Sequence, residues 1–147
     1  METTTARARF LERSKTFGYT SLRLAIGMSM LIHGVARFPK LSVFAQQTVK
    51  MFAGSPLPAP AVELFARVTP FVEFAIGLSV LLGLATIWGL TCGGLWMVVL
   101  IFGSTLIEKY DIVGIQLIYS IIFFELLLRI EHNEISLDTL IERRAKT

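Results

Sequence analysis

The stretch that most constrains the fold is the uncharged sequence after Glu73. Glu73 is the one charged residue between Phe71 and Ile107, and the 34 residues that follow it carry no charge. As a single helix they would extend about 51 Å at ~1.5 Å per residue, whereas the hydrocarbon core of a bilayer is about 30 Å thick. One membrane span cannot use all of them. We therefore predict two spans joined by a tight turn at residues 83–86, which read GLAT.

The composition of the chain indicates a single membrane domain. Of its 147 residues, 54% are hydrophobic and 17% are charged, and the mean hydropathy is +0.66. This balance is too apolar for a small soluble domain. The net charge of +3 is concentrated at the chain ends, so we expect no nucleic-acid partner. Cys92 is the single cysteine, so redox chemistry would need a bound cofactor or another subunit.

Hydropathy and helix-breaking residues predict an all-α fold, a four-helix transmembrane bundle. The predicted spans cover four ranges: 17–38, 62–84, 86–107 and 112–130. Pro39 ends the first span, because the residue before a proline is pushed out of the helical region. An amphipathic segment at 41–52 suits a helix lying in the membrane interface. The chain then divides into three parts: a basic N-terminal tail 1–16, the four-helix membrane domain 17–130 and a charged C-terminal tail 131–147.

Small residues and helix breakers mark where helices should meet or end. Gly27 and Gly34 share one face of the first span with Arg23, so a neighbouring helix can approach closely there. We assign structural roles to seven residues: Gly27, Gly34, Arg37, Pro39, Pro70, Gly77 and Gly83. Three basic residues near one membrane surface are most simply read as anchors near lipid headgroups: Arg37, Lys40 and Arg67.

The distribution of basic residues predicts the orientation. With four spans, both termini lie on one side, where there are eight lysines and arginines against five on the other side. The positive-inside tendency therefore favours cytoplasmic termini. We expect an integral protein of a bacterial-type cytoplasmic (inner) membrane.

Ionisable residues within the spans predict a buried polar pocket. Such groups cost at least a few kcal/mol each in a bilayer, so they usually face the bundle and have partners. Counting residues along each span at ~1.5 Å per residue puts Arg23 and Glu125 at a similar depth and Glu73 near the midplane. We predict a pocket built by Arg23, Glu73 and Glu125. Three residues are expected to add to it nearer the other face: His33, Gln116 and Tyr119.

Each of these residues also has a purely structural interpretation. In the structural interpretation, Arg23 and a carboxylate form an ion pair that only fixes the bundle. Glu125 and Arg129 are four residues apart and can pair with each other. His33 can be a packing residue, and so can Cys92. The two histidines, His33 and His132, lie towards opposite faces, so we expect no metal or haem site.

Three segments of the chain resemble one known family. They read LRLAIGMSMLIHGVARF, TPFVEFAIGLSVLLGLAT and GIQLIYSIIFFELLL, and the resemblance covers about Leu22 to Leu128. Their order and spacing resemble the DoxX-like family of small four-helix integral membrane proteins. That family includes the membrane subunit of thiosulfate:quinone oxidoreductase. The resemblance implies that Arg23, His33, Gly34 and Glu73 occupy recurring polar positions, with Arg37 where a lysine is common.

Three functions are compatible with these features. The first is a redox-associated subunit whose pocket binds quinone or another lipid-soluble ligand, since histidine and carboxylates can exchange protons with a quinol. The second is a non-enzymatic scaffold subunit that packs through a glycine-rich face with Gly89, Gly93 and Gly94. The third is a small proton-coupled transporter using Glu73 and Glu125. The expected partners are the lipid bilayer and either a second copy of the chain or a membrane complex. No complete catalytic set is present, and no cofactor other than quinone is indicated.

Overall fold

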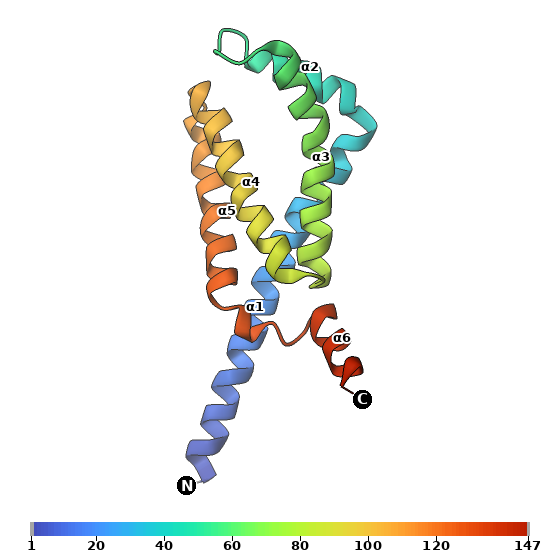
Figure 1. Cartoon of the computed structure of the whole chain (residues 1–147). Coiled ribbons are helices and arrows are strands. Elements are labelled where there is room, and N and C mark those ends of the chain that lie inside the picture. The colour runs from blue at the N-terminus through green and yellow to red at the C-terminus, as the bar shows by residue number, and fades with distance from the viewer. Residues whose placement is uncertain (1, 147) are drawn as a thin grey trace.

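The chain folds into helices and turns. The structure is a computed structural model that describes residues 2–146, with side chains described for residues 7 and 10–146. The six α-helices are α1 (Glu2–Arg37), α2 (Leu41–Met51), α3 (Ala59–Leu82), α4 (Thr86–Leu106), α5 (Tyr110–Leu128) and α6 (Leu137–Ala145). Short 3-10 helices lie at Phe38–Lys40 and Ile130–His132. In Figure 1 the start of α1 and the helix α6 lie at one end of the molecule, here called the terminal end, and α2 lies at the opposite end.

The long uncharged stretch folds into a helical hairpin, as its length predicted. Within residues 2–146, three helices are long and apolar enough to cross a membrane: α3, α4 and α5. Their outer faces expose large apolar side chains such as Trp88 (73% exposed) and Phe102 (60% exposed), as contact with lipid requires. Gly83 ends α3 in the left-handed conformation, with φ of 64°, which glycine adopts without a Cβ clash.

The first helix differs from the expected one. It begins at Glu2 rather than near residue 17, and it extends beyond the other long helices at the terminal end (Figure 1). Residues 2–16 contain neither proline nor glycine, so nothing interrupts the helix there. α1 is not one of the three helices found long and apolar enough to cross a membrane. Its second half carries three ionisable residues, Arg23, His33 and Arg37.

Glycines let α1 and α3 pack backbone against backbone. A Cβ atom added to Gly77 would lie 2.2 Å from the amide nitrogen of Leu31. Added to Gly27, it would lie 2.7 Å from the amide nitrogen of Leu81. These contacts set an antiparallel register in which the end of α1 lies beside the middle of α3, and Arg23 lies beside the end of α3.

A hydrophobic core joins this pair to the antiparallel pair of α4 and α5. Its most buried side chains come from all four helices: Met30, Val80, Leu90, Phe123 and Leu126. The close packing of α4 on α5 again depends on a glycine, because a Cβ at Gly93 would lie 2.3 Å from the ring of Phe123. At the opposite end, α2 packs against α3, as Figure 1 shows.

Candidate functional site

The most deeply buried carboxylate of the spanning helices forms an ion pair. Glu73 in α3 is 4% exposed, and its Oε2 accepts a hydrogen bond from Nη1 of Arg37 in the last turn of α1. The Arg37 guanidinium also lies over the ring of Phe44 in α2, 4.8 Å from its centroid. Arg37 therefore links three helices. Breaking such a buried pair costs more than forming it gains, because one charge is left without a partner.

This ion pair lies in the wall of a cavity between the helices. The cavity has a volume of about 280 Å³ and is lined by residues from α1 through α5. Its lining is mainly apolar, and its polar members are His33, Arg37, Thr48, Thr69, Glu73, Ser104, Gln116 and Tyr119. An apolar pocket with a few converging polar groups is the usual form of a small-molecule site.

Two aromatic rings form one side of the cavity. The rings of His33 and Tyr119 are stacked, with centroids 6.4 Å apart and an interplanar angle of 16°. The Tyr119 hydroxyl is 2.5 Å from Oγ of Ser29 on α1, so it shares a hydrogen bond with that side chain. This contact holds α5 against α1 at the level of the cavity.

The amide of Gln116 is only partly satisfied. Its Nε2 donates a hydrogen bond of 3.0 Å to Oγ of Ser104 on α4. Its Oε1 is buried and has no hydrogen-bond partner within the described part of the chain. A buried acceptor without a partner is costly, so this side of the cavity can gain energy from a hydrogen-bond donor.

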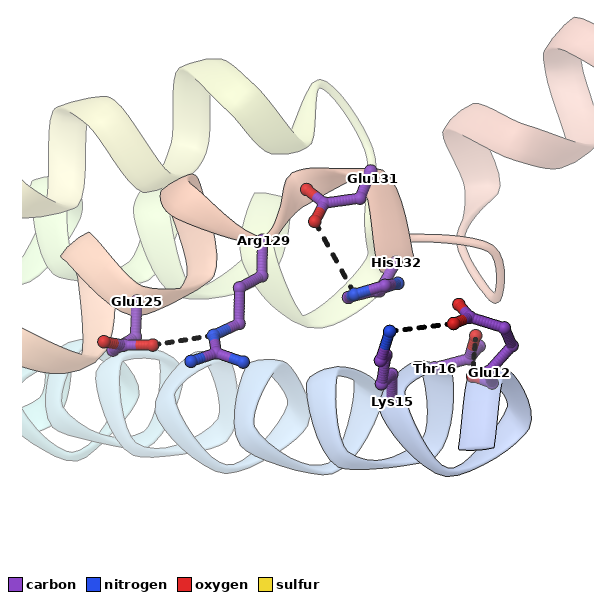
Figure 2. A network of polar contacts seen from close by, with 7 residues as sticks. All are labelled: Glu12, Lys15, Thr16, Glu125, Arg129, Glu131 and His132. Atoms are coloured by element: carbon purple, nitrogen blue, oxygen red, sulfur yellow. Dashed lines mark hydrogen bonds and ion pairs between the residues drawn. The ribbon is translucent and has the colours of Figure 1, made fainter. Parts of the chain in front are cut away.

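The cavity brings together four of the six predicted pocket residues: His33, Glu73, Gln116 and Tyr119. Glu125 is elsewhere. Its Oε2 is 2.8 Å from Nε of Arg129, one turn further along the chain, and Figure 2 shows this pair beside α1. Neither residue lines the cavity. The alternative pairing of Glu125 with Arg129 is therefore the one observed.

Arg23 also lies outside the cavity, so its predicted pairing with Glu73 or Glu125 is wrong. It is 2% exposed. Its Nη1 donates to the carbonyl oxygens of Val80 (2.6 Å) and Leu81 (3.0 Å), and its Nη2 donates to that of Ile135 (2.8 Å). The last carbonyls of a helix carry partial negative charge, which a cation stabilises. Arg23 thus caps α3.

Depth counting failed because it treated the helices as independent. The glycine contacts between α1 and α3 bring Arg37, not Arg23, to the level of Glu73. Arg37, the partner of Glu73, is predicted from the sequence only as a headgroup anchor or a structural residue. The recurring glycines were the sequence signal that could have indicated this register. The contribution of α2 to the cavity wall, through Phe44 and Thr48, was also missed.

Asp138 is a second polar residue that sequence reasoning missed. From α6 it accepts hydrogen bonds from the backbone N–H of Ala85 (2.7 Å), the N–H of Thr86 (2.8 Å) and Oγ1 of Thr86 (2.7 Å). Its own N–H donates to the Gly83 carbonyl (2.9 Å). Asp138 therefore caps the start of α4 from a distant part of the chain, where a carboxylate is favoured.

Replacing Asp138 with alanine should lower the free energy of unfolding by about 1–2 kcal/mol at neutral pH, the usual cost of losing a helix cap. Burial alone would raise the pKa of Asp138, but hydrogen bonds from Thr86 and Ala85 and the charge of Arg23 lower it below its ordinary value of 3.8. A carboxylate whose pKa is lower in the folded state stabilises the fold at pH values above its pKa in the unfolded state. This stabilisation is lost as the pH falls through its pKa in the folded state.

The measurement is thermal unfolding of the wild type and the Asp138→Ala variant in detergent between pH 3 and pH 7. The difference in melting temperature should be largest at neutral pH and should shrink below about pH 4. The Asp138→Asn variant is the control, because asparagine keeps the shape of the side chain but loses its charge. Its melting temperature should lie between those of the wild type and Asp138→Ala. A difference that grows on acidification would contradict the capping role.

No metal site is evident among the described residues, which contain no group of three or more His, Cys, Asp or Glu side chains able to hold an ion. Cys92 is exposed on α4. The ring nitrogen Nε2 of His132 is 3.6 Å from Oε1 of Glu131 (Figure 2), and neither residue lines the cavity. The candidate site is therefore the cavity around Glu73.

Apolar helices with exposed hydrophobic faces and a buried ion pair define an integral membrane protein. The family model DoxX matches residues 18–105, more than half of the chain. The chain belongs to the DoxX family. Searches of curated proteins and of solved structures each found no match. The matched region includes Glu73, Arg37 and His33 but ends before Gln116 and Tyr119.

Proposed function

We propose that the cavity binds a lipid-soluble ligand with a polar ring, most readily a quinone, and that the chain is a redox-associated membrane subunit. The observation that carries this proposal is the Arg37–Glu73 pair in a mainly apolar wall. A soluble ligand would need more polar contacts, whereas a plain lipid tail would need none.

The residues of the cavity suit a quinone ring. His33 and Tyr119 offer aromatic faces, and aromatic rings favour offset stacking. The unpartnered Oε1 of Gln116 suits a donor such as the ring hydroxyl of the reduced form, the quinol. Glu73 and His33 are groups that can hold and exchange a proton. A bound quinone would supply the electron chemistry, and the electron donor would be a separate protein.

The same proposal includes a fourth span. Residues 17–37 of α1 run beside α3, and the buried charge of Arg23 is balanced by helix-end carbonyls. These features suit a helix that crosses the bilayer as part of a four-helix bundle, with α2 at the interface. The excess of basic residues at the terminal end supports cytoplasmic termini in an inner membrane.

Cysteine labelling in intact cells tests this orientation. A Cys92→Ser background with Lys146→Cys should resist a membrane-impermeant maleimide, whereas Lys109→Cys in the same background should react with it. The reverse pattern would contradict the proposed orientation, and labelling of both positions would contradict a membrane crossing by α5, the candidate span that lies between them.

The decisive functional test is quinone binding by the purified protein. We expect quinone to co-purify in mild detergent and to bind saturably after removal. The variant Glu73→Gln should bind the reduced quinol about tenfold more weakly, since a hydrogen bond from a quinol hydroxyl to the charged carboxylate would contribute about 1.5–3 kcal/mol. Glu125→Gln is the matched control, because Glu125 pairs with Arg129 outside the cavity, and its affinity should equal that of the wild type.

Because Glu73→Gln also leaves Arg37 without a charged partner, a second variant separates binding from folding. Gln116→Leu keeps a similar volume and removes the unpartnered amide oxygen. It should weaken binding of the reduced quinol, whose hydroxyl would donate to that oxygen. The melting temperature should stay close to that of the wild type, because removing the unsatisfied acceptor offsets the lost bond to Ser104. Wild-type protein that neither carries quinone nor binds it saturably would refute the proposal.

The other two functions have less support. In the scaffold interpretation, Gly89 and Gly93 form a face for a partner helix, but they already face Ser79 and Phe123 of the same chain. In the transporter interpretation, Glu73 and Glu125 act together, but only Glu73 lines the cavity. A role as accessory subunit therefore rests on surfaces other than these glycines, and pull-down from native membranes in mild detergent tests it.

A further inference from the structure

A second hollow lies beside the candidate site, where α1 meets α2. It has a volume of about 410 Å³. Three of its lining residues also line the first cavity: His33, Arg37 and Phe44. Its other members come from the end of α1, the following turn and α2, and include Lys40 and Gln47. The two hollows thus share the Arg37–Phe44 contact in their walls.

The second hollow is cationic. Two of its lining residues, Arg37 and Lys40, are positively charged, and no carboxylate is among the described residues that line it. Glu73 neutralises Arg37 from the other side, in the first cavity. The charge of Lys40, whose side chain is exposed, has no acidic counterpart in the hollow. The titratable groups that face this charge are His33 and Arg37, and neither is an acid.

The position of this hollow indicates which anion it meets. α1 ends at Arg37 and α2 begins at Leu41, so the hollow lies at the end of a helix that runs beside the spanning helix α3. Helix ends in membrane proteins lie at the level of the lipid headgroups. Val43, which also lines the hollow, is 50% exposed and offers an apolar surface for an acyl chain next to the cations.

We propose that this second hollow binds the phosphate group of an anionic phospholipid. Lys40 supplies the charge, Gln47 and the outer edge of Arg37 supply further hydrogen-bond donors, and Val43 contacts the start of an acyl chain. Ammonium and guanidinium groups are the usual phosphate ligands in proteins. The inference does not depend on quinone binding. It does link the two hollows, because a phosphate near Arg37 competes with Glu73 for the same guanidinium.

Native mass spectrometry of the full chain from nanodiscs tests the proposal. In mixed phosphatidylcholine and phosphatidylglycerol nanodiscs, the wild type should retain phosphatidylglycerol preferentially. Lys40→Gln should reduce that retention about fivefold, as expected for loss of about 1 kcal/mol from one cation. Lys50→Gln is the matched control, because Lys50 is an exposed lysine at the opposite end of α2 that does not line the hollow, and it should behave as the wild type.

Two further arms distinguish the sources of the phosphate group. Inorganic phosphate at 20 mM in lipid-free detergent should leave the melting temperature unchanged, because the site also needs the acyl chain. Equal retention by Lys40→Gln and the wild type would overturn the proposal. An equal loss in Lys50→Gln would reduce the effect to general attraction by surface charge. Stabilisation by inorganic phosphate that Lys40→Gln abolishes would assign the site to the free anion instead.

Discussion

Replacing Gly77 with leucine is expected to separate α1 from α3 and to cost about 3 kcal/mol or more of the free energy of unfolding. A Cβ at this position would lie 2.2 Å from the backbone nitrogen and 2.6 Å from the Cα of Leu31. Backbone atoms cannot rotate away as the end of a side chain can, so the helices must move apart. The expected result is a strongly lowered melting temperature in detergent, or failure to purify as a single species.

Gly114→Leu is the control for this experiment. Gly114 lies in the spanning helix α5, and an added Cβ there would meet no atom within 4 Å. Leucine is a better helix former than glycine, so this variant should be as stable as the wild type or more stable. If both leucine variants lost stability equally, the backbone contact between α1 and α3 would not be what holds these helices together.

Replacing Arg23 with methionine is expected to have a similarly large effect, of about 3 kcal/mol. Methionine replaces the unbranched stem of the side chain but leaves the carbonyl oxygens of Val80, Leu81 and Ile135 without their donor. Thermal unfolding in detergent should show the loss. Trypsin should also cleave the C-terminal segment faster, since the bond to Ile135 is one of its attachments to the bundle.

The same variant distinguishes a cap on α3 from a ligand-binding role. Arg23 does not line the cavity, so any folded Arg23→Met protein should bind quinone with wild-type affinity. Arg23→Lys should recover part of the stability, because an ammonium group cannot reproduce the fork of guanidinium donors. A stable Arg23→Met protein that had lost quinone binding would restore the original assignment of Arg23 to the pocket.

The helices themselves were largely predictable from local sequence. The 34-residue uncharged stretch required a turn on grounds of length alone, and Gly83 marked it. The predicted ranges of the later spans agree with α3, α4 and α5 to within a few residues. These features follow from hydropathy and backbone conformation, which are encoded by neighbouring residues.

The partners of the charged residues were less predictable, because they depend on register between helices. Arg37 pairs with Glu73 only because Gly34 and Gly77 bring α1 and α3 into contact at that level. Asp138 caps α4 although it lies some fifty residues further along the chain, so no capping motif in the local sequence predicts this contact. In contrast, Glu125 and Arg129 form a local pair, and their spacing in the sequence was enough to suggest it.

Photoaffinity labelling with an azido-quinone tests directly whether the cavity is a quinone site. The purified protein is irradiated with the probe in nanodiscs, digested and mapped by mass spectrometry, with excess unlabelled quinone as competitor. We predict competable labels on the segments around His33, Glu73 and Tyr119, which line the cavity. Labels confined to outward-facing residues such as Trp88 and Phe124, unaffected by competitor, would contradict a quinone site in the cavity.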